Sequence, residues 1–291
     1  MFQPAGLVAV LFLAIGLAFG APVVESALAQ SASDQVVGAP EPWQLNFQDA
    51  ASPVKEQVHQ FHNMLLVIIT AISVFVLALL AYVIIRYNEK MNPEPSKTSH
   101  NTLIEVIWTA VPVMILIVIV VPSFSLLYYM DRTPDADLTI KTTGYQWYWT
   151  YEYPDYKDLE FTSIMLQEDE LQPGQPRLLA TDNDVVVPVG ANVRLLITAA
   201  DVLHAWAMPA LGVKKDAVPG RLNETWFRAD KPGMYYGQCS EICGEGHGFM
   251  PISLRAVPMA EFEAWVEEMG GEAITAAIEP RRLAEAAVSA E

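Results

Sequence analysis

A short stretch near the C-terminal end of the chain gathers side chains that bind soft metal ions. It holds both cysteines of the chain, Cys239 and Cys243, followed by His247 and Met250. A second histidine, His204, lies 35 residues before the first cysteine. Thiolate and thioether sulfurs favour copper, whereas imidazole suits both copper and zinc. These residues therefore predict a metal site with a preference for copper.

The number of sulfurs separates the possible kinds of copper site. A mononuclear blue-copper site uses one cysteine, two histidines and a weak axial methionine, which leaves one cysteine over in this chain. Two thiolates on one loop can instead bridge two copper ions, each of which takes one histidine. Met250 would then be a weak ligand to one copper, and the backbone carbonyl of Glu241 is best placed to serve the other. The alternatives are a zinc site built from the two cysteines and two histidines, or a disulfide between the cysteines.

The residues before this stretch predict two membrane-spanning helices. Uncharged segments at 64–85 and 106–129 are each long enough to cross a bilayer. The connecting loop, 86–105, carries three of the four Lys and Arg residues found before Asp131. The positive-inside rule then places this loop in the cytoplasm, so both ends of the hairpin emerge on the opposite face.

The N-terminal end has the pattern of a secreted or membrane-inserted protein. An apolar run of 13 residues at 7–19 is followed by a small-x-small pattern that ends at Ala29. This predicts a signal peptide over 1–29, although no Lys or Arg precedes the apolar run, and an uncleaved short helix is the alternative. Residues 30–63 are expected to form an N-terminal periplasmic segment.

The residues after the second span change to short runs rich in β-forming side chains. The clearest runs are 138–141, 192–198, 225–229 and 251–257. Turn signals with glycine or proline separate them, which predicts an antiparallel sandwich or barrel over 131–258. A small β-sandwich whose metal ligands come from one strand end and one later loop follows the cupredoxin plan. Residues 259–291 are expected to form a short helix and a tail without a core pattern.

The charge of the chain is strongly acidic. The net charge is −17, and the residues from Asp131 onward include 26 acidic and 13 basic side chains. An acidic domain repels nucleic acid and attracts a basic partner. The composition therefore argues against nucleic-acid binding and is compatible with a basic protein partner.

The metal-binding stretch and several other motifs of the sequence resemble those of a known family. The run Gly237–Gly244, together with His247 and Met250, looks like the copper A loop of cytochrome c oxidase subunit II. The resemblance extends from about Pro42 to Val266 and includes three further motifs, Gly144–Trp149, Asp201–His204 and Pro219–Asn223. It implies a two-helix transmembrane hairpin followed by an all-β cupredoxin-like domain.

The resemblance also implies a function. Such a subunit accepts electrons from cytochrome c at a binuclear copper A centre. It passes them to haem in subunit I, where oxygen is reduced and protons are pumped, and the complex also contains subunit III. The location implied is a bacterial cytoplasmic membrane with the copper domain in the periplasm. The chain alone is not expected to reduce oxygen.

Individual residues take expected roles from the same resemblance. Trp147 matches the exposed tryptophan through which electrons enter from cytochrome c. Glu105 matches the entrance of a proton pathway, and the carboxylate of Glu241 matches a ligand of magnesium shared with subunit I. Acidic side chains expected to form a docking face for cytochrome c are Glu152, Asp155, Asp158, Asp182 and Asp201. One departure is Tyr145, which stands where many members have histidine.

Three other classes of protein share parts of this pattern. A membrane-anchored copper chaperone can carry two cysteines at this spacing and a distant histidine. It needs only one span, and it lacks the spacing from the cysteines to a histidine and a methionine that His247 and Met250 have in this chain. A quinol oxidase subunit II has the same architecture without the copper ligands. Nitrous oxide reductase has a similar copper loop without the two-span hairpin.

Overall fold

The structure, a computed structural model, describes residues 35–273. The chain divides into two compact units, a helical hairpin over 54–132 and a β domain built from the segments on either side of it. The predicted signal peptide over 1–29 and the tail residues 274–291 lie outside the described range. The predicted architecture of a two-helix hairpin followed by an all-β cupredoxin-like domain is confirmed.

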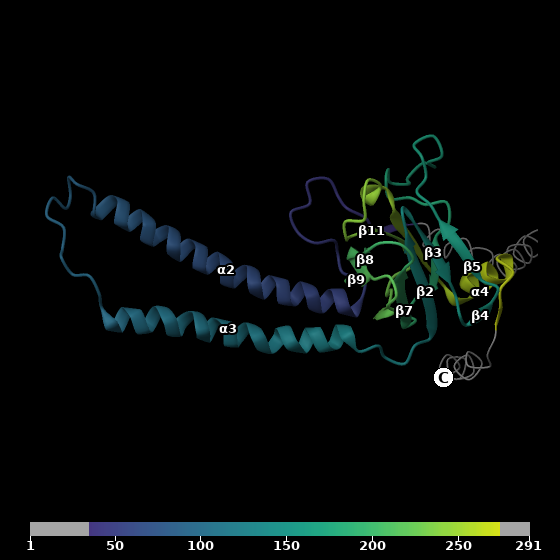
Figure 1. Ribbon diagram of the computed structural model, residues 1–291, viewed down its shortest axis with the longest axis horizontal. Helices are drawn as coiled ribbons and strands as arrows, with labels where there is room; N and C mark the ends of the chain where they lie inside the picture. The colour runs from purple at the N-terminus through teal and green to yellow at the C-terminus, as the bar shows by residue number, and fades with distance from the viewer. Residues whose placement is uncertain (1–34, 274–291) are drawn as a thin grey trace, which may run out of the picture. The chain divides into compact units, whose positions relative to one another are not determined.

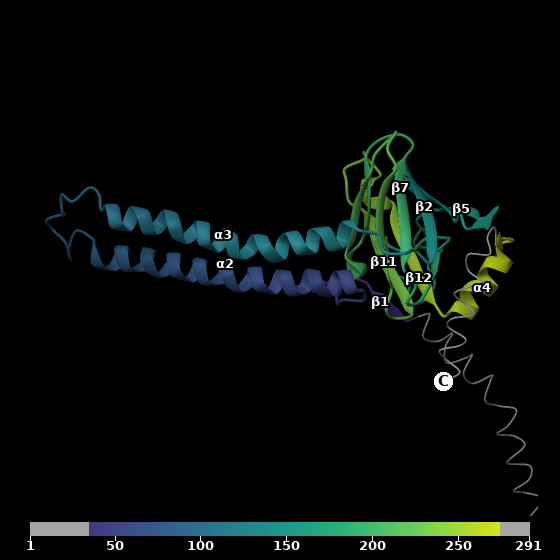
Figure 2. The same cartoon turned by 90° about the horizontal axis from the view of Figure 1, so that it is seen from below.

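The hairpin consists of α2, Pro53–Arg86, and α3, Thr102–Asp131. The two helices run alongside one another in both views (Figures 1 and 2). Proline is favoured at the first position of a helix, as at the start of α2. At the start of α3 the Asn101 side chain accepts a hydrogen bond from the Ile104 amide, which caps the helix. Both helices are long and apolar enough to cross a membrane, and the predicted spans 64–85 and 106–129 lie within them.

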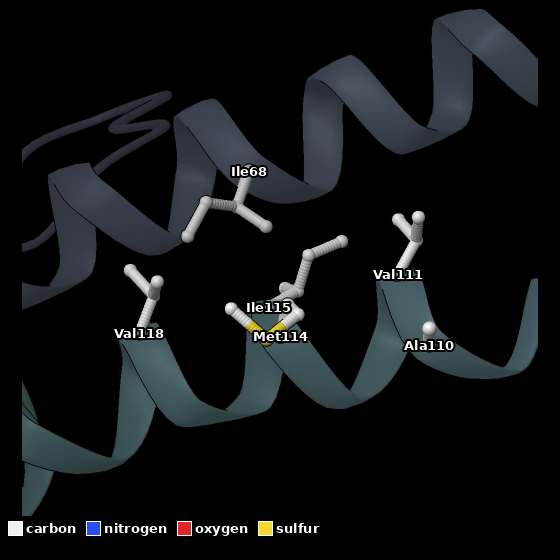
Figure 3. A pocket seen from close by; sticks show the side chains of 6 residues that line it. All are labelled: Ile68, Ala110, Val111, Met114, Ile115 and Val118. Atoms are coloured by element: carbon white, nitrogen blue, oxygen red, sulfur yellow. The ribbon is translucent and has the colours of Figure 1, made fainter. Parts of the chain in front are cut away.

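A hollow of about 350 Å³ lies between the two helices. Its lining is entirely apolar and consists of Ile68, Ala110, Val111, Met114, Ile115 and Val118. Figure 3 shows Ile68 of α2 opposite Ile115 and Val118 of α3. Without a polar group to orient a reactant, this hollow suits apolar neighbours rather than chemistry.

The β domain contains two main sheets. The first has six strands in the order β6, β12, β11, β8, β9, with β1 also beside β11. Its strands are β1 Val36–Gly38, β6 Val185–Pro188, β8 His204–Met208, β9 Val213–Ala217, β11 Gly233–Cys239 and β12 Pro251–Val257. The second sheet has five strands in the order β10, β7, β2, β3, β5. Its strands are β2 Leu138–Tyr145, β3 Tyr148–Glu152, β5 Glu160–Ser163, β7 Val193–Ala199 and β10 Asn223–Phe227.

Shorter elements complete the domain. Two 3-10 turns, η1 Pro209–Leu211 and η2 His247–Phe249, follow β8 and precede β12. Helix α4, Met259–Glu268, follows β12, and a two-stranded ribbon joins β4, Tyr156–Lys157, to β13, Glu272–Ala273. Helix α4 lies where the sequence predicts a short helix after residue 258, and its Phe262 and Val266 side chains are buried.

The two main sheets enclose one hydrophobic core. Along β2 the side chains alternate between buried and partly buried for most of the strand, as expected for a strand with one face on the core. Trp149 of β3 and Trp206 of β8 are both fully buried and belong to opposite sheets. The core therefore fixes β3 and β8, and β8 begins with the predicted ligand His204.

The strand predictions differ from the structure in three respects. The run at 225–229 is displaced, because β10 covers Asn223–Phe227 and pairs with β7 over that whole length. The strand β8 was missed because all five of its residues are buried, which removes the alternation that marks a strand. Finally, the sheets are mixed rather than antiparallel throughout, since β2 pairs with β7 and β12 pairs with β6 in parallel.

Candidate metal centre

The predicted ligands come from three elements that the first sheet brings together. His204 begins β8, Cys239 ends β11, and these two strands pair so that Trp206 lies opposite Cys239. The remaining ligands lie on the loop between β11 and β12, which includes η2. Antiparallel pairing of β8 with β11 thus places a histidine beside a cysteine that lies 35 residues later.

Backbone hydrogen bonds close the loop tightly. The Cys239 amide donates to the Met250 carbonyl over 3.2 Å, which joins the two ends of the loop. The His247 amide donates to the Gly244 carbonyl over 3.2 Å and holds the turn of η2. Gly244 has a φ of 119°, which side chains rarely adopt, so glycine is needed where the chain reverses after Cys243.

The six predicted donor atoms lie close together, with four of them grouped around the two cysteine sulfurs. The two Sγ atoms lie 3.9 Å apart, and His204 Nδ1 lies 3.8 Å from Cys239 Sγ. The Glu241 carbonyl oxygen lies 3.3 Å from the same sulfur. On the other side, Cys243 Sγ lies 3.6 Å from His247 Nδ1 and 3.5 Å from Met250 Sδ. Each sulfur thus has one imidazole and one weaker donor beside it.

Burial and charge set the protonation of the cysteine pair. Burial opposes ionisation of the Cys239 thiol, yet hydrogen bonds with His204 and the nearby backbone lower its pKa to about 6. Burial, followed by the charge of Cys239, raises the pKa of Cys243 to about 12. Near neutral pH the pair therefore keeps one proton, and a metal bound to both sulfurs must displace it.

Asp201 orients the first ligand histidine. Its Oδ1 lies 2.9 Å from His204 Nε2, which leaves Nδ1 directed towards Cys239. A carboxylate on the far nitrogen of a histidine is the usual support of a metal-binding imidazole. The same carboxylate accepts a hydrogen bond from the Gln146 amide over 2.8 Å. Asp201 therefore joins the ligand histidine to the turn between β2 and β3.

The predicted tryptophan, Trp147, packs against the metal-binding loop from the neighbouring sheet. Trp147 and Gln146 form the turn between β2 and β3, and the rings of Tyr145 and Tyr148 stack at its base with centroids 4.9 Å apart. The Trp147 indole Nε1 donates to the Cys243 carbonyl over 3.3 Å. A Cβ added to Gly246 would overlap this indole, so the ring lies directly against the loop backbone.

Sequence reasoning missed two residues of this site. Gln146 Nε2 donates to the Cys243 carbonyl over 2.7 Å, although 97 residues separate them. Gly144 of β2 lies against His204, because a Cβ there would come within 2.9 Å of the ring atom Cδ2. Only the position of Gln146 next to Trp147 hinted at its contact, and no sequence pattern predicts the contact of Gly144.

The remaining predicted residues lie outside the cluster of donors. Four of the expected docking residues bond to their neighbours. Glu152 contacts the Lys141 ammonium, and Asp158 contacts the Lys157 ammonium. Asp155 accepts a hydrogen bond from the Thr139 amide, and Asp182 accepts one from the Ile164 amide. Glu105 lies on α3 and accepts a hydrogen bond from the Asn101 amide, so it takes part in the cap of that helix. The Glu241 side chain is exposed.

Known proteins share both units of this chain. The family profile described as "Cytochrome C oxidase subunit II, periplasmic domain" matches residues 138–257, and the one described as "Cytochrome C oxidase subunit II, transmembrane domain" matches residues 40–126. A probable cytochrome c oxidase subunit 2 of Rickettsia bellii (strain RML369-C) is 56% identical over 227 residues, which are 78% of this chain and 84% of the relative. The chain belongs to the cytochrome c oxidase subunit II family. Cytochrome c oxidase subunit 2 of Zea mays is 51% identical over 234 residues, 78% of this chain and 90% of the relative.

A solved structure is also similar. The periplasmic domain of subunit II of cytochrome oxidase of Bradyrhizobium japonicum is 58% identical and covers 48% of this chain and 97% of that one, with a TM-score of 0.45. Membership of the subunit II family makes this chain a membrane-anchored subunit of a haem–copper oxidase, an oxidoreductase complex in which it partners other subunits. Membership of the family also supports an electron-entry role in that complex and implies that the chain binds copper.

The donors present fit that metal. Two thiolates, two imidazoles, a thioether and a carbonyl form a soft set, which suits copper better than a hard cation. Cys239 and Cys243 are both free thiols, so both sulfurs remain available as ligands. A zinc site would use the cysteines and histidines but would leave Met250 Sδ, which is 3.5 Å from Cys243 Sγ, without a role.

Proposed function

We propose that this chain accepts electrons from cytochrome c at a binuclear copper centre and passes them to haem in subunit I of the oxidase. One observation carries the proposal: each of two sulfurs 3.9 Å apart has its own imidazole and its own weak donor. A single metal ion does not need this duplicated set. His204, Cys239, Cys243, His247, Met250 and the Glu241 carbonyl would hold copper A, which when bound would supply a one-electron redox centre that rearranges little in each transfer.

The protein's own residues hold the ligands and limit the access of water. His204, Cys239, Cys243 and Met250 are buried, while His247 is partly exposed. Fixed, mostly dry ligands change geometry little when charge moves through them, which favours fast electron transfer. The partly exposed His247 is the ligand through which the site most easily reaches a neighbouring subunit.

Electrons are proposed to enter through Trp147. The indole is partly exposed, and its Nε1 hydrogen bonds to the carbonyl of the ligand residue Cys243. A partner that contacts the indole is thus separated from a ligand by one hydrogen bond and the covalent bonds of Cys243. Because electron tunnelling slows steeply with distance, this short connection supports the role.

Apolar and acidic side chains beside the site suit a protein partner. Val202, Leu203, Ile242 and Phe249 expose between 36% and 80% of their surface next to ligand residues, as surfaces that bind proteins do. Asp201 lies at the same end of β3 as Trp147, whereas Glu152 is five residues along that strand, roughly 17 Å away. We propose that Asp201 acts at the contact and that Glu152, Asp155, Asp158 and Asp182 attract basic cytochrome c from a distance.

Three further assignments complete the proposal. The exposed carboxylate of Glu241 would bind magnesium shared with subunit I, since Mg²⁺ is usually held by only one or two protein carboxylates. Glu105 would serve the entrance of a proton pathway in an oxidase that pumps protons. The complex, with subunits I and III, would lie in a bacterial cytoplasmic membrane, with the copper domain in the periplasm.

Metal analysis with electron paramagnetic resonance tests the centre. The full chain in detergent, loaded with copper, is expected to bind two copper ions and to show the hyperfine pattern of one unpaired electron shared equally by two nuclei. Cys239→Ser should remove that pattern. One copper with the pattern of a single nucleus would instead favour a membrane-anchored copper chaperone, and zinc alone would indicate a structural site.

A further inference from the structure

The turn that carries Trp147 is fastened to the metal-binding loop at one point. The Cys243 carbonyl accepts from Gln146 Nε2 over 2.7 Å and from Trp147 Nε1 over 3.3 Å. On the other side of the turn, the Gln146 backbone amide donates to Asp201 Oδ2 over 2.8 Å. Gln146 thus bonds through both its backbone and its side chain to residues of the metal centre.

The two bonds to the shared carbonyl differ in strength. N–H···O hydrogen bonds are commonest near 2.9–3.0 Å and weaken beyond about 3.2 Å, so the bond from Gln146 is strong and the bond from the indole is weak. A carbonyl oxygen has two lone pairs and can accept both. The weak indole bond alone gives a partly exposed ring little directional restraint.

The packing around the indole adds contact without a directed bond. The ring is partly buried against the hydrophobic core and lies against the backbone of Gly246, which carries no side chain that could bond to it. Tyr145 and Tyr148 stack on one another at the base of the turn and so stabilise the end of the strands rather than its tip. The carboxamide of Gln146 therefore makes the stronger of the two directed bonds between the tip of the turn and the Cys243 carbonyl.

We propose that Gln146 is a positioning residue whose carboxamide, bound to the Cys243 carbonyl, holds the Trp147 indole in contact with the metal-binding loop. The proposal rests on the proposed role of Trp147 in electron acceptance. A loosened tip would break the connection from indole to ligand residue. The copper ligands themselves would keep their places, because the carboxamide bonds to the backbone carbonyl of Cys243 and not to its sulfur. The loop is also closed by the hydrogen bonds from the Cys239 amide to the Met250 carbonyl and from the His247 amide to the Gly244 carbonyl.

Hydrogen exchange of the Trp147 indole N–H measures this contact independently of electron-transfer activity. The full chain has seven tryptophans, so selective ¹⁵N-indole labelling in detergent micelles resolves Trp147, which Trp147→Phe assigns. Gln146→Met keeps the length of the side chain and removes its donor. We expect exchange at Trp147 to become about three- to tenfold faster, the effect of losing one ordinary hydrogen bond. Gln172→Met is the matched control, because Gln172 is exposed on another loop.

Electron transfer in the assembled oxidase provides the second measurement. Gln146→Met is expected to lower the rate of electron transfer from bound cytochrome c several-fold, with an unchanged KM and an unchanged copper resonance. A residue that merely docks the partner would raise KM instead, and that result would overturn the proposal. Unchanged indole exchange in Gln146→Met would overturn it too.

The same variants separate this proposal from the one on which it rests. If Trp147→Phe slows electron transfer while Gln146→Met changes neither exchange nor rate, the role of Trp147 stands and the role of Gln146 falls. If Trp147→Phe leaves electron transfer unchanged, the proposed path through the indole fails, and the positioning role fails with it.

Discussion

At the scale of single residues, the two cysteines are not equivalent. Cys239 lies beside His204 and is the stronger acid of the pair, whereas burial, followed by the charge of the Cys239 thiolate, raises the pKa of Cys243. The chain therefore holds one negative sulfur before any metal arrives. A cationic metal is attracted to that thiolate first and completes the site by displacing the second proton.

This asymmetry predicts the titration of the metal-free protein. One thiolate should form as the pH rises through about 6, and the second sulfur should stay protonated until about pH 12. The ultraviolet absorbance of thiolate in the reduced full chain measures the lower step, below the pH at which tyrosines ionise. Cys239→Ser should remove the lower step and, by removing the neighbouring charge, bring the pKa of Cys243 down. Two overlapping steps near the usual cysteine pKa would contradict the prediction.

At the scale of elements, the site depends on how closely β2 approaches the start of β8. Gly144 pairs with Trp149 on one side and with Ala199 on the other, so the backbone of β2 has no freedom to move away from His204. A side chain at this position would push the imidazole or Trp149 out of place. The absence of a side chain at Gly144 thus leaves room for the His204 imidazole.

A pair of glycine substitutions tests this approach. Gly144→Ala would place a Cβ 2.9 Å from the His204 ring and 3.1 Å from Trp149. We expect it to lower the free energy of unfolding of the metal-free chain by about 1–3 kcal/mol and to weaken copper binding. Gly248→Ala is the control: it adjoins His247, yet its Cβ would meet nothing within 4 Å. Denaturant unfolding and copper titration compare the two, and equal effects would refute the explanation.

The same elements show what sequence reasoning can and cannot reach. The loop donors were predictable because Cys239, Cys243, His247 and Met250 are close in sequence and their chemistry is unusual. Helices α2 and α3 were predictable because apolar length alone marks a membrane span. The contact of Gln146 with Cys243 was not predictable, since it depends on the mixed order of strands in two sheets. Nor does a pattern mark β8, in which every side chain is buried.

At the scale of the whole molecule, charge distribution governs the encounter with a partner. The net charge is −17, and most acidic residues lie in the β domain. Several of them also bond locally, so their contribution to partner binding is a long-range field rather than fixed ion pairs. Such a field is screened over about 8–10 Å at physiological salt.

Ionic strength should therefore change association more than electron transfer. In the assembled oxidase, raising the salt concentration is expected to lower the association rate of cytochrome c steeply, while the electron-transfer rate within the bound complex stays constant. Stopped-flow kinetics separate the two rates. Glu152→Gln should weaken the salt dependence slightly, and Glu168→Gln, at an exposed residue paired with Arg177, provides a comparison. An association rate that does not respond to salt would argue against an electrostatic approach.

The pairing of β1 with β11 has a consequence for how the chain is inserted. Val36 before α2 lies beside Met234 after α3, and the Met234 amide bonds to the Gln35 carbonyl over 2.7 Å. Segments that share one sheet must lie on one side of the membrane, so the chain between them crosses it an even number of times. During biogenesis the N-terminal segment must therefore be translocated. Until it arrives, the strand that ends at Cys239 lacks this neighbour.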